Sequence, residues 1–120
     1  MGDLSAHFSR HEFACQCGCG YDAVDPRLIE TLEFARSAVG GPLHITSGCR
    51  CDAHNLAVGG VENSAHTRGK AADISCVDAR TRHRLVQALL EAGAFGVGVA
   101  KSFVHADIDV RLPRPALWGY

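Results

Sequence analysis

The segment Phe103–Val110 alternates apolar and polar side chains, and this pattern most constrains the fold. Alternate residues of a β-strand lie on the same face. The apolar face would carry Val104, Ala106, Ile108 and Val110, and the opposite face His105, Asp107 and Asp109. The segment therefore predicts a strand with one packed face, and a solvated outer face would give the same alternation. The pattern alone leaves the role of the polar side chains open.

Helix signals flank several short strand-like segments. Asp25-Pro26 is typical of a helix start, and Gly40-Gly41 ends that helix. A second helix is predicted between Asp78 and Gly93, and a shorter one from Asp52 as its cap. Strands are predicted over 42–46, 70–74, 96–100 and 103–110. The elements predict an α+β domain with a small antiparallel sheet and helices packed on one side.

A chain of 120 residues is expected to form a single domain spanning 1–120. Within it, 1–24 is a cysteine-containing N-terminal segment and 111–120 is a proline-rich tail ending in Trp118 and Tyr120. The tail either folds back over the sheet or forms a flexible end.

Charge and hydropathy exclude several classes of function. The formal net charge is −1, and no basic block indicates binding to nucleic acid. No apolar run is long enough to span a bilayer. The N-terminus lacks the positive start and apolar centre of a secretory signal, so we expect synthesis in the cytoplasm without a signal peptide. We also expect a monomer.

His66, Asp73 and His105 are the candidate metal ligands. His66 and Asp73 are seven residues apart, with Gly69 between them to fold the loop back. Asp73 lies in an apolar run, where a carboxylate is costly to bury unless it is paired or bound to a metal. Two histidines and one aspartate match the three protein ligands of a catalytic zinc. The plainer alternative is a turn-capping aspartate and a surface histidine.

Three blocks carry a family resemblance. The pattern Ser64-x-His66-x-x-Gly69-x-Ala71-x-Asp73 resembles the first zinc motif of the M15 peptidases, the D-alanyl-D-alanine carboxypeptidase family, which shares its fold with the hedgehog signalling domain. The segment 47–55 resembles the substrate-anchoring loop of that family, and 103–107 resembles its second zinc motif. The blocks follow the order of the family, and the resemblance covers about residues 8–107.

The resemblance implies a fold and an activity. It implies a hedgehog/DD-peptidase-like domain with one catalytic Zn²⁺ held by His66, Asp73 and His105. Arg50 would bind the terminal carboxylate of the substrate, and Ser64 would support the site or the substrate. The implied substrates are peptidoglycan stem peptides of the bacterial cell wall that end in D-alanine. Cleavage within a cross-link is an open alternative to removal of a terminal residue.

The general base expected of the family is missing. The positions just before His105 hold Val99, Ala100, Ser102 and Phe103, none of which accepts a proton usefully. Asp107 is the best substitute, either as the base or as a partner that orients His105, and His54 is a remoter candidate. The gap leaves a second hypothesis, a non-catalytic or weakly catalytic zinc-containing module that binds cell-wall peptides.

An enzyme of this kind without a signal peptide would suit a phage lysis or tail protein, or a bacterial protein exported by another route.

Six cysteines cluster in the sequence, at 15, 17 and 19, at 49 and 51, and at 76. They could form disulfides between the N-terminal loop and the Arg50 loop, remain as reduced buried thiols, or bind a second metal. The Cys-x-Cys-x-Cys spacing differs from the Cys-x-x-Cys of common zinc knuckles. On an extended segment, alternate cysteines would point to opposite faces.

Overall fold

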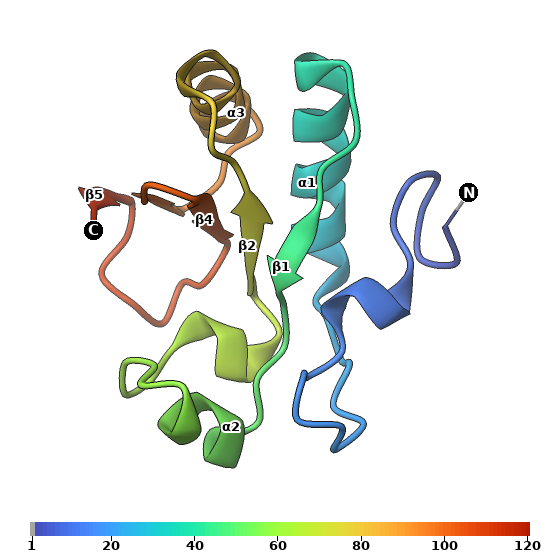
Figure 1. Ribbon diagram of the computed structural model, residues 1–120, viewed down its shortest axis with the longest axis vertical. Coiled ribbons are helices and arrows are strands. Elements are labelled where there is room, and N and C mark those ends of the chain that lie inside the picture. The colour runs from blue at the N-terminus through green and yellow to red at the C-terminus, as the bar shows by residue number, and fades with distance from the viewer. Residues whose placement is uncertain (1) are drawn as a thin grey trace.

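A five-stranded sheet with helices α1 and α3 against one face forms the centre of the computed structural model, which describes residues 2–120 (Figure 1). The elements in chain order are η1 (Arg10–Phe13), α1 (Pro26–Val39), β1 (Ile45–Ser47), α2 (Asp52–Ala57), η2 (Ala65–Arg68), β2 (Ala71–Ser75), α3 (Ala79–Glu91), β3 (Gly96–Val99), β4 (Phe103–Asp107) and β5 (Ala116–Gly119). The strand order is β1-β2-β4-β3-β5. The α+β class predicted from the sequence is confirmed.

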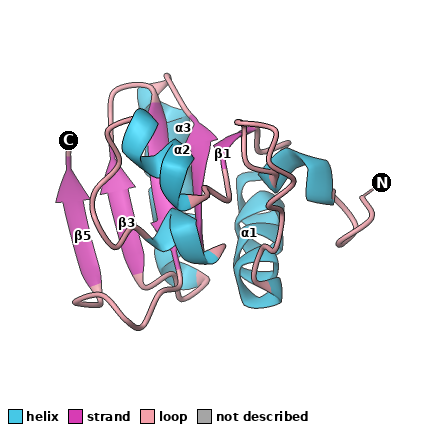
Figure 2. Ribbon diagram, turned by 90° about the horizontal axis from the view of Figure 1, so that it is seen from below, coloured by secondary structure: helices cyan, strands magenta, loops and turns pink. Residues whose placement is uncertain are grey.

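The sheet is mixed rather than wholly antiparallel. The pairs β1·β2, β2·β4 and β3·β4 are antiparallel as expected, whereas β5 pairs with β3 in parallel. The proline-rich tail supplies this extra strand, visible beside β3 in Figure 2. After β4 the chain turns back and reaches the free edge of β3. Because β3 itself runs opposite to β4, the returning strand is parallel to it.

The apolar core lies between the sheet and the two longer helices. Its buried side chains include Leu28 and Leu32 of α1, Leu85 and Leu89 of α3, and Ile74, Val97, Val104 and Ala106 of the sheet. Strand β4 ends at Asp107, earlier than the alternation predicts, and Val110 is consequently exposed. The opposite face of the sheet carries the polar side chains of β2 and β4. Within residues 2–120, no helix combines the length and apolar character needed to cross a membrane.

Local signals explain where the helices begin and end. The Asp25 side chain accepts a hydrogen bond from the Arg27 backbone N–H, and Gly40 ends α1 with a φ of 81°. Asp78 caps α3 through the Thr81 N–H. The prediction that Asp52 caps α2 is wrong, because the cap is Cys51, whose Sγ accepts from the His54 N–H at 3.4 Å.

Asp25 also pairs with Lys70 at 2.5 Å, which joins the start of α1 to the residue before β2. Burial alone would raise the pKa of Asp25, but hydrogen bonds from Arg27 and Lys70 hold it below its ordinary value. We expect Asp25→Ala to lower the free energy of unfolding by about 1–2 kcal/mol through loss of the cap. Asp25→Asn should lose less, because asparagine caps equally well.

Denaturant unfolding at several pH values tests this prediction. A carboxyl whose folded pKa is depressed stabilises the fold above its unfolded pKa of about 3.9, and this stabilisation is lost as pH falls below it. The gap between wild type and Asp25→Asn should therefore be constant near neutral pH and shrink in acid. A gap that widened in acid would contradict the ion pair as its source.

Candidate metal centre

His66, Asp73 and His105 converge on the polar face of the sheet. Asp73 Oδ1 lies 3.3 Å from His66 Nε2 and 3.1 Å from His105 Nδ1. Asp73 of β2 and His105 of β4 are direct cross-strand partners, and His66 comes from η2 at the end of the preceding loop. One potential donor atom from each of the three residues lies within 4.8 Å of the others. The three side chains are thus arranged around one point.

The turn η2 fixes the direction of His66. The Ser64 side chain accepts a hydrogen bond from the His66 backbone N–H at 3.2 Å. Gly69 ends the turn with a φ of 69°, and a Cβ there would lie 2.2 Å from the Ala23 carbonyl oxygen. His66 Nδ1 donates to the Gly48 carbonyl at 2.7 Å. Because Nδ1 donates this hydrogen bond, Nε2, which faces Asp73, is the nitrogen that would bind a metal.

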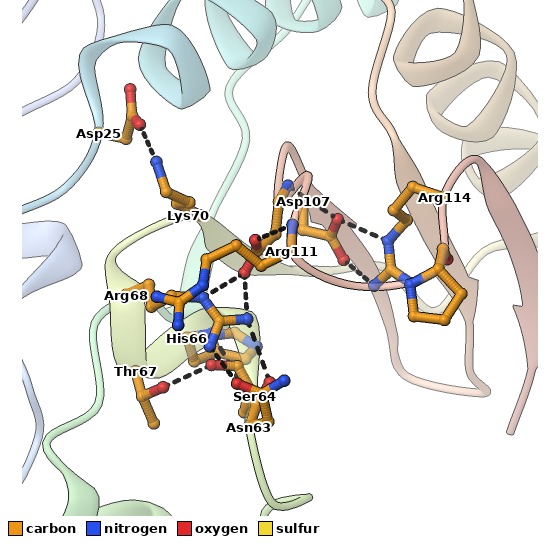
Figure 3. A network of polar contacts seen from close by, with 12 residues as sticks. Asp25, Asn63, Ser64, His66, Thr67, Arg68, Lys70, Asp107, Arg111 and Arg114 are labelled. Carbon is orange, nitrogen blue, oxygen red and sulfur yellow. Dashed lines mark hydrogen bonds and ion pairs between the residues drawn. The ribbon is translucent and has the colours of Figure 1, made fainter.

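Asp107 holds His105 from the other side. Its Oδ2 lies 2.7 Å from His105 Nε2. The Arg114 guanidinium donates to both carboxylate oxygens at 2.9 and 2.6 Å (Figure 3). Oδ1 also accepts from the Asp109 N–H at 3.3 Å. These contacts occupy the four lone-pair sites of a carboxylate. The geometry therefore favours the orienting role for Asp107 over the role of general base.

Ion pairing sets the charge of these side chains. Burial would raise the pKa of Asp73, but hydrogen bonds with His105 and His66 keep it below its ordinary value. The pKa of Asp107 is likewise lowered against burial by His105 and Arg114. Burial would lower the pKa of His105, but Asp107 and Asp73 raise it. Both carboxylates are therefore ionised. Their negative charge favours the binding of a cation, either a metal ion or a proton, between the carboxylates and the histidines.

The donor set fits zinc. Tetrahedral zinc with bonds of about 2.0–2.1 Å separates its ligand atoms by about 3.3–3.4 Å. The separations of 3.3 and 3.1 Å from Asp73 Oδ1 are close to this value. Each imidazole also has a hydrogen-bond partner on its other nitrogen, as metal-bound histidines usually do. His66, Asp73 and His105 could thus hold one zinc ion.

The three side chains border a cavity of about 720 Å³. Arg50 lies in its wall, with Nη2 3.7 Å from Asp73 Oδ2. Its Nη1 donates to Asn55 Oδ1 at 2.9 Å, and Asn55 in turn donates to the Val61 carbonyl at 3.0 Å. Asn55 therefore fixes the guanidinium beside the candidate metal ligands. Sequence reasoning placed Asn55 in a helix and gave it no function.

The C-terminal tail contributes side chains that sequence reasoning missed. The Trp118 ring lies 5.3 Å from the His105 ring, and the Arg114 guanidinium lies 5.0 Å from the Trp118 centroid. A Cβ at Gly98 would approach Trp118 Nε1 to 2.6 Å, so β3 needs glycine where the indole crosses it. The sequence held one signal of this contact. Aromatic residues in the tail and glycines in the predicted strand 96–100 together indicate that an aromatic side chain packs across that strand.

Asp109 lies beyond the end of β4 and does not line the cavity. Its side chain is fully buried and accepts a hydrogen bond from Arg68 Nε at 2.6 Å. Arg68 Nη1 also donates to Asn63 at 2.6 Å. The pair ties the loop that carries His66 to the end of β4.

His54 and Glu62 are the remaining candidates for proton transfer. Both line the cavity, and in the described part of the chain neither side chain forms a hydrogen bond or ion pair. His54 belongs to α2, and Glu62 to the exposed loop before η2. They differ in this respect from Asp107, whose oxygens are all engaged.

One family model, described as Peptidase M15, matches residues 6–108 of the chain. The matched region contains the three candidate ligands and Arg50 but ends before Arg114 and Trp118. No curated protein matches the chain.

Proposed function

The chain belongs to the peptidase M15 family, and on this premise we propose that it is a zinc-dependent D-alanyl-D-alanine carboxypeptidase acting on peptidoglycan stem peptides. Family membership itself supports a zinc metallopeptidase. The observation that carries the finer proposal is the position of Arg50, which shares one cavity with the three candidate ligands and lies 3.7 Å from Asp73. A cation at this place suits a substrate whose carboxylate is close to the scissile bond.

Each residue has a role that its contacts support. Zinc, when bound, would polarise the scissile carbonyl and activate water. Arg50 uses one N–H on Asn55 and a second, longer one on Ser47, which leaves others of its five donors for a carboxylate. Asn55 holds the guanidinium in place. The distance from the terminal carboxylate of a bound substrate to the metal ligands is therefore fixed. Such an anchor would favour cleavage of the terminal peptide bond.

The candidates for proton transfer are residues of the cavity wall whose side chains have no other partner within residues 2–120. Asp107 accepts from His105 Nε2 and thereby keeps Nδ1 free for the metal. His54 and Glu62 remain able to exchange protons with a substrate or water in the cavity.

A module that binds cell-wall peptides with little or no turnover is the second candidate function. The full engagement of Asp107 favours it, because the carboxylate nearest to His105 in sequence is not free to act as a base. Retention of Arg50 in the cavity is compatible with either function.

We propose that the protein acts as a monomer on the cell wall, as part of a phage lysis or tail apparatus or as an exported bacterial protein. The substrate class carries this proposal, since peptidoglycan peptides lie outside the membrane.

Mass spectrometry of muropeptides incubated with the zinc-loaded protein tests the proposed reaction. We expect loss of the terminal alanine, and a fall in kcat/KM of at least about 100-fold in Arg50→Ala, because charge-assisted hydrogen bonds contribute about 1.5–3 kcal/mol each. Arg50→Lys should recover only part of it, since lysine lacks the planar pair of donors. The exposed Arg80→Ala is the matched control.

A synthetic peptide with an amidated C-terminus completes the experiment. The carboxypeptidase should fail on it, and equal cleavage of the acid and amide forms would indicate an internal peptide bond instead. Arg50-dependent binding of muropeptides without any cleavage would favour the binding module.

A further inference from the structure

Four cysteines form a second cluster in the N-terminal part of the molecule. Cys15, Cys17 and Cys19 come from the loop after η1, and Cys51 follows Arg50 in the chain. The Sγ atoms are 3.5 Å apart for Cys15 and Cys17, 3.9 Å for Cys15 and Cys51, and 3.6 Å for Cys17 and Cys51. All four Sγ atoms lie within 4.8 Å of one another. None of the four belongs to the candidate metal centre.

These separations suit a thiolate metal site. Tetrahedral zinc with Zn–S bonds of about 2.3 Å separates its sulfur atoms by about 3.8 Å. A disulfide requires about 2.05 Å between the sulfurs, and all six cysteines are unpaired in the structure. Pairing into disulfides would also use the sulfurs two at a time, whereas here each of three sulfurs has the other two as near neighbours.

The backbone explains why alternate cysteines meet. The segment is a closed turn, in which the Gly18 N–H donates to the Cys15 carbonyl at 3.2 Å and the Cys15 N–H to the Tyr21 carbonyl at 2.7 Å. Gly18 and Gly20 have φ values of 83° and 89°, which other residues rarely adopt. The expectation that alternate cysteines point to opposite faces assumed an extended segment and does not apply here.

Two backbone N–H groups point at the sulfurs. The Cys51 N–H donates to Cys15 Sγ, and the His54 N–H to Cys51 Sγ, each at 3.4 Å. Such donors stabilise a thiolate and accompany sulfur ligands of metals. The other two cysteines differ, because Cys49 and Cys76 are buried in the hydrophobic core and do not belong to the group of four.

We propose that Cys15, Cys17, Cys19 and Cys51 bind a structural zinc ion. Four thiolates close the coordination shell, so this ion stabilises the fold and takes no part in hydrolysis. It joins the N-terminal loop to the start of α2, directly beside Arg50 and one turn before Asn55. The ion therefore positions Arg50 for the substrate. This consequence rests on the proposed function, whereas the proposal that the cysteines bind zinc does not depend on it.

Metal content of the protein, purified in the presence of a thiol reductant without chelator, tests the proposal. We expect about two zinc ions per chain in the wild type and about one in Cys17→Ser and Cys51→Ser. Cys49→Ser and Cys76→Ser are matched controls that should keep both. His66→Ala should lose the other ion, so failure of the catalytic site and failure of the cysteine site are distinguishable.

Cobalt substitution identifies the ligands without an activity assay. The cobalt-loaded wild type and His66→Ala should show the intense thiolate-to-cobalt charge-transfer absorption, and Cys17→Ser should lose most of it. Cys17→His, which keeps a ligand, should retain zinc even where serine unfolds the loop. Three results would overturn the proposal. The first is an unchanged zinc content in both Cys17→Ser and Cys51→Ser, and the second is bound iron instead of zinc. The third is that, after the metal is chelated, the four cysteines are alkylated only when a reductant is added, which would indicate disulfides.

Discussion

Asp73→Asn is expected to lower zinc affinity by more than about 100-fold and to abolish peptide hydrolysis. Loss of an outer partner of a ligand already costs about 10–100-fold in affinity, and Asp73 contacts both histidines directly at 3.3 and 3.1 Å. Asparagine keeps the shape of the side chain but supplies a neutral oxygen. The substitution also leaves Arg50 without its nearest anionic neighbour.

Zinc titration against a competing chelator and hydrolysis of a stem peptide measure the two effects. Glu62→Gln is the matched control, because it neutralises a carboxylate of the same cavity that is not among the three candidate ligands. It should keep its zinc, and a loss of hydrolysis with zinc retained would identify Glu62 as the base. Full hydrolysis by Asp73→Asn would contradict the assigned metal centre.

Zinc affinity of the wild type should also fall in acid. The pKa of His105 is raised by Asp107 and Asp73 against the effect of burial, and a ligand must lose its proton before it binds the metal. Protons therefore compete with zinc from a higher pH than an ordinary histidine would give.

The geometry of the candidate ligands was predictable because it follows from strand pairing. A histidine on one strand and an aspartate on its neighbour, each on the polar face, meet when the strands pair antiparallel, as Asp73 and His105 do. The Ser64 cap and the glycine after the turn were equally local features. Capping residues in the sequence also predicted both ends of α1 and the cap of α3.

The contacts made by the tail were not predictable from local pattern. Arg114 reaches Asp107 because β5 pairs in parallel with β3, and nothing in the tail itself specifies that edge. The Arg68–Asp109 pair joins residues 41 positions apart. The cysteine cluster depends on the positive φ angles of Gly18 and Gly20. The alternation of cysteines along the sequence suggests an extended segment and gives no indication of this turn.

Arg114→Met is expected to destabilise the fold by about 3–5 kcal/mol, because it leaves the fully buried Asp107 carboxylate without its cation. His105 alone would then compensate the charge, and its Nδ1 would be less well held for the metal. We therefore also expect zinc affinity to fall by about 10–100-fold, as for the loss of other outer partners. Arg114 lies outside the region that the family model matches, so this support belongs to the tail of this chain.

Denaturant unfolding and zinc titration of the same variants separate charge from packing. The matched control is Arg111→Met, an exposed arginine of the same tail, which should change the free energy of unfolding by less than about 0.5 kcal/mol. Adding Asp107→Asn to Arg114→Met should recover part of the stability, because the uncompensated charge is removed. It should not restore zinc affinity, because an amide orients His105 less strongly than a carboxylate. If Arg114→Met matched the control in both measurements, the tail would have no part in holding the metal centre.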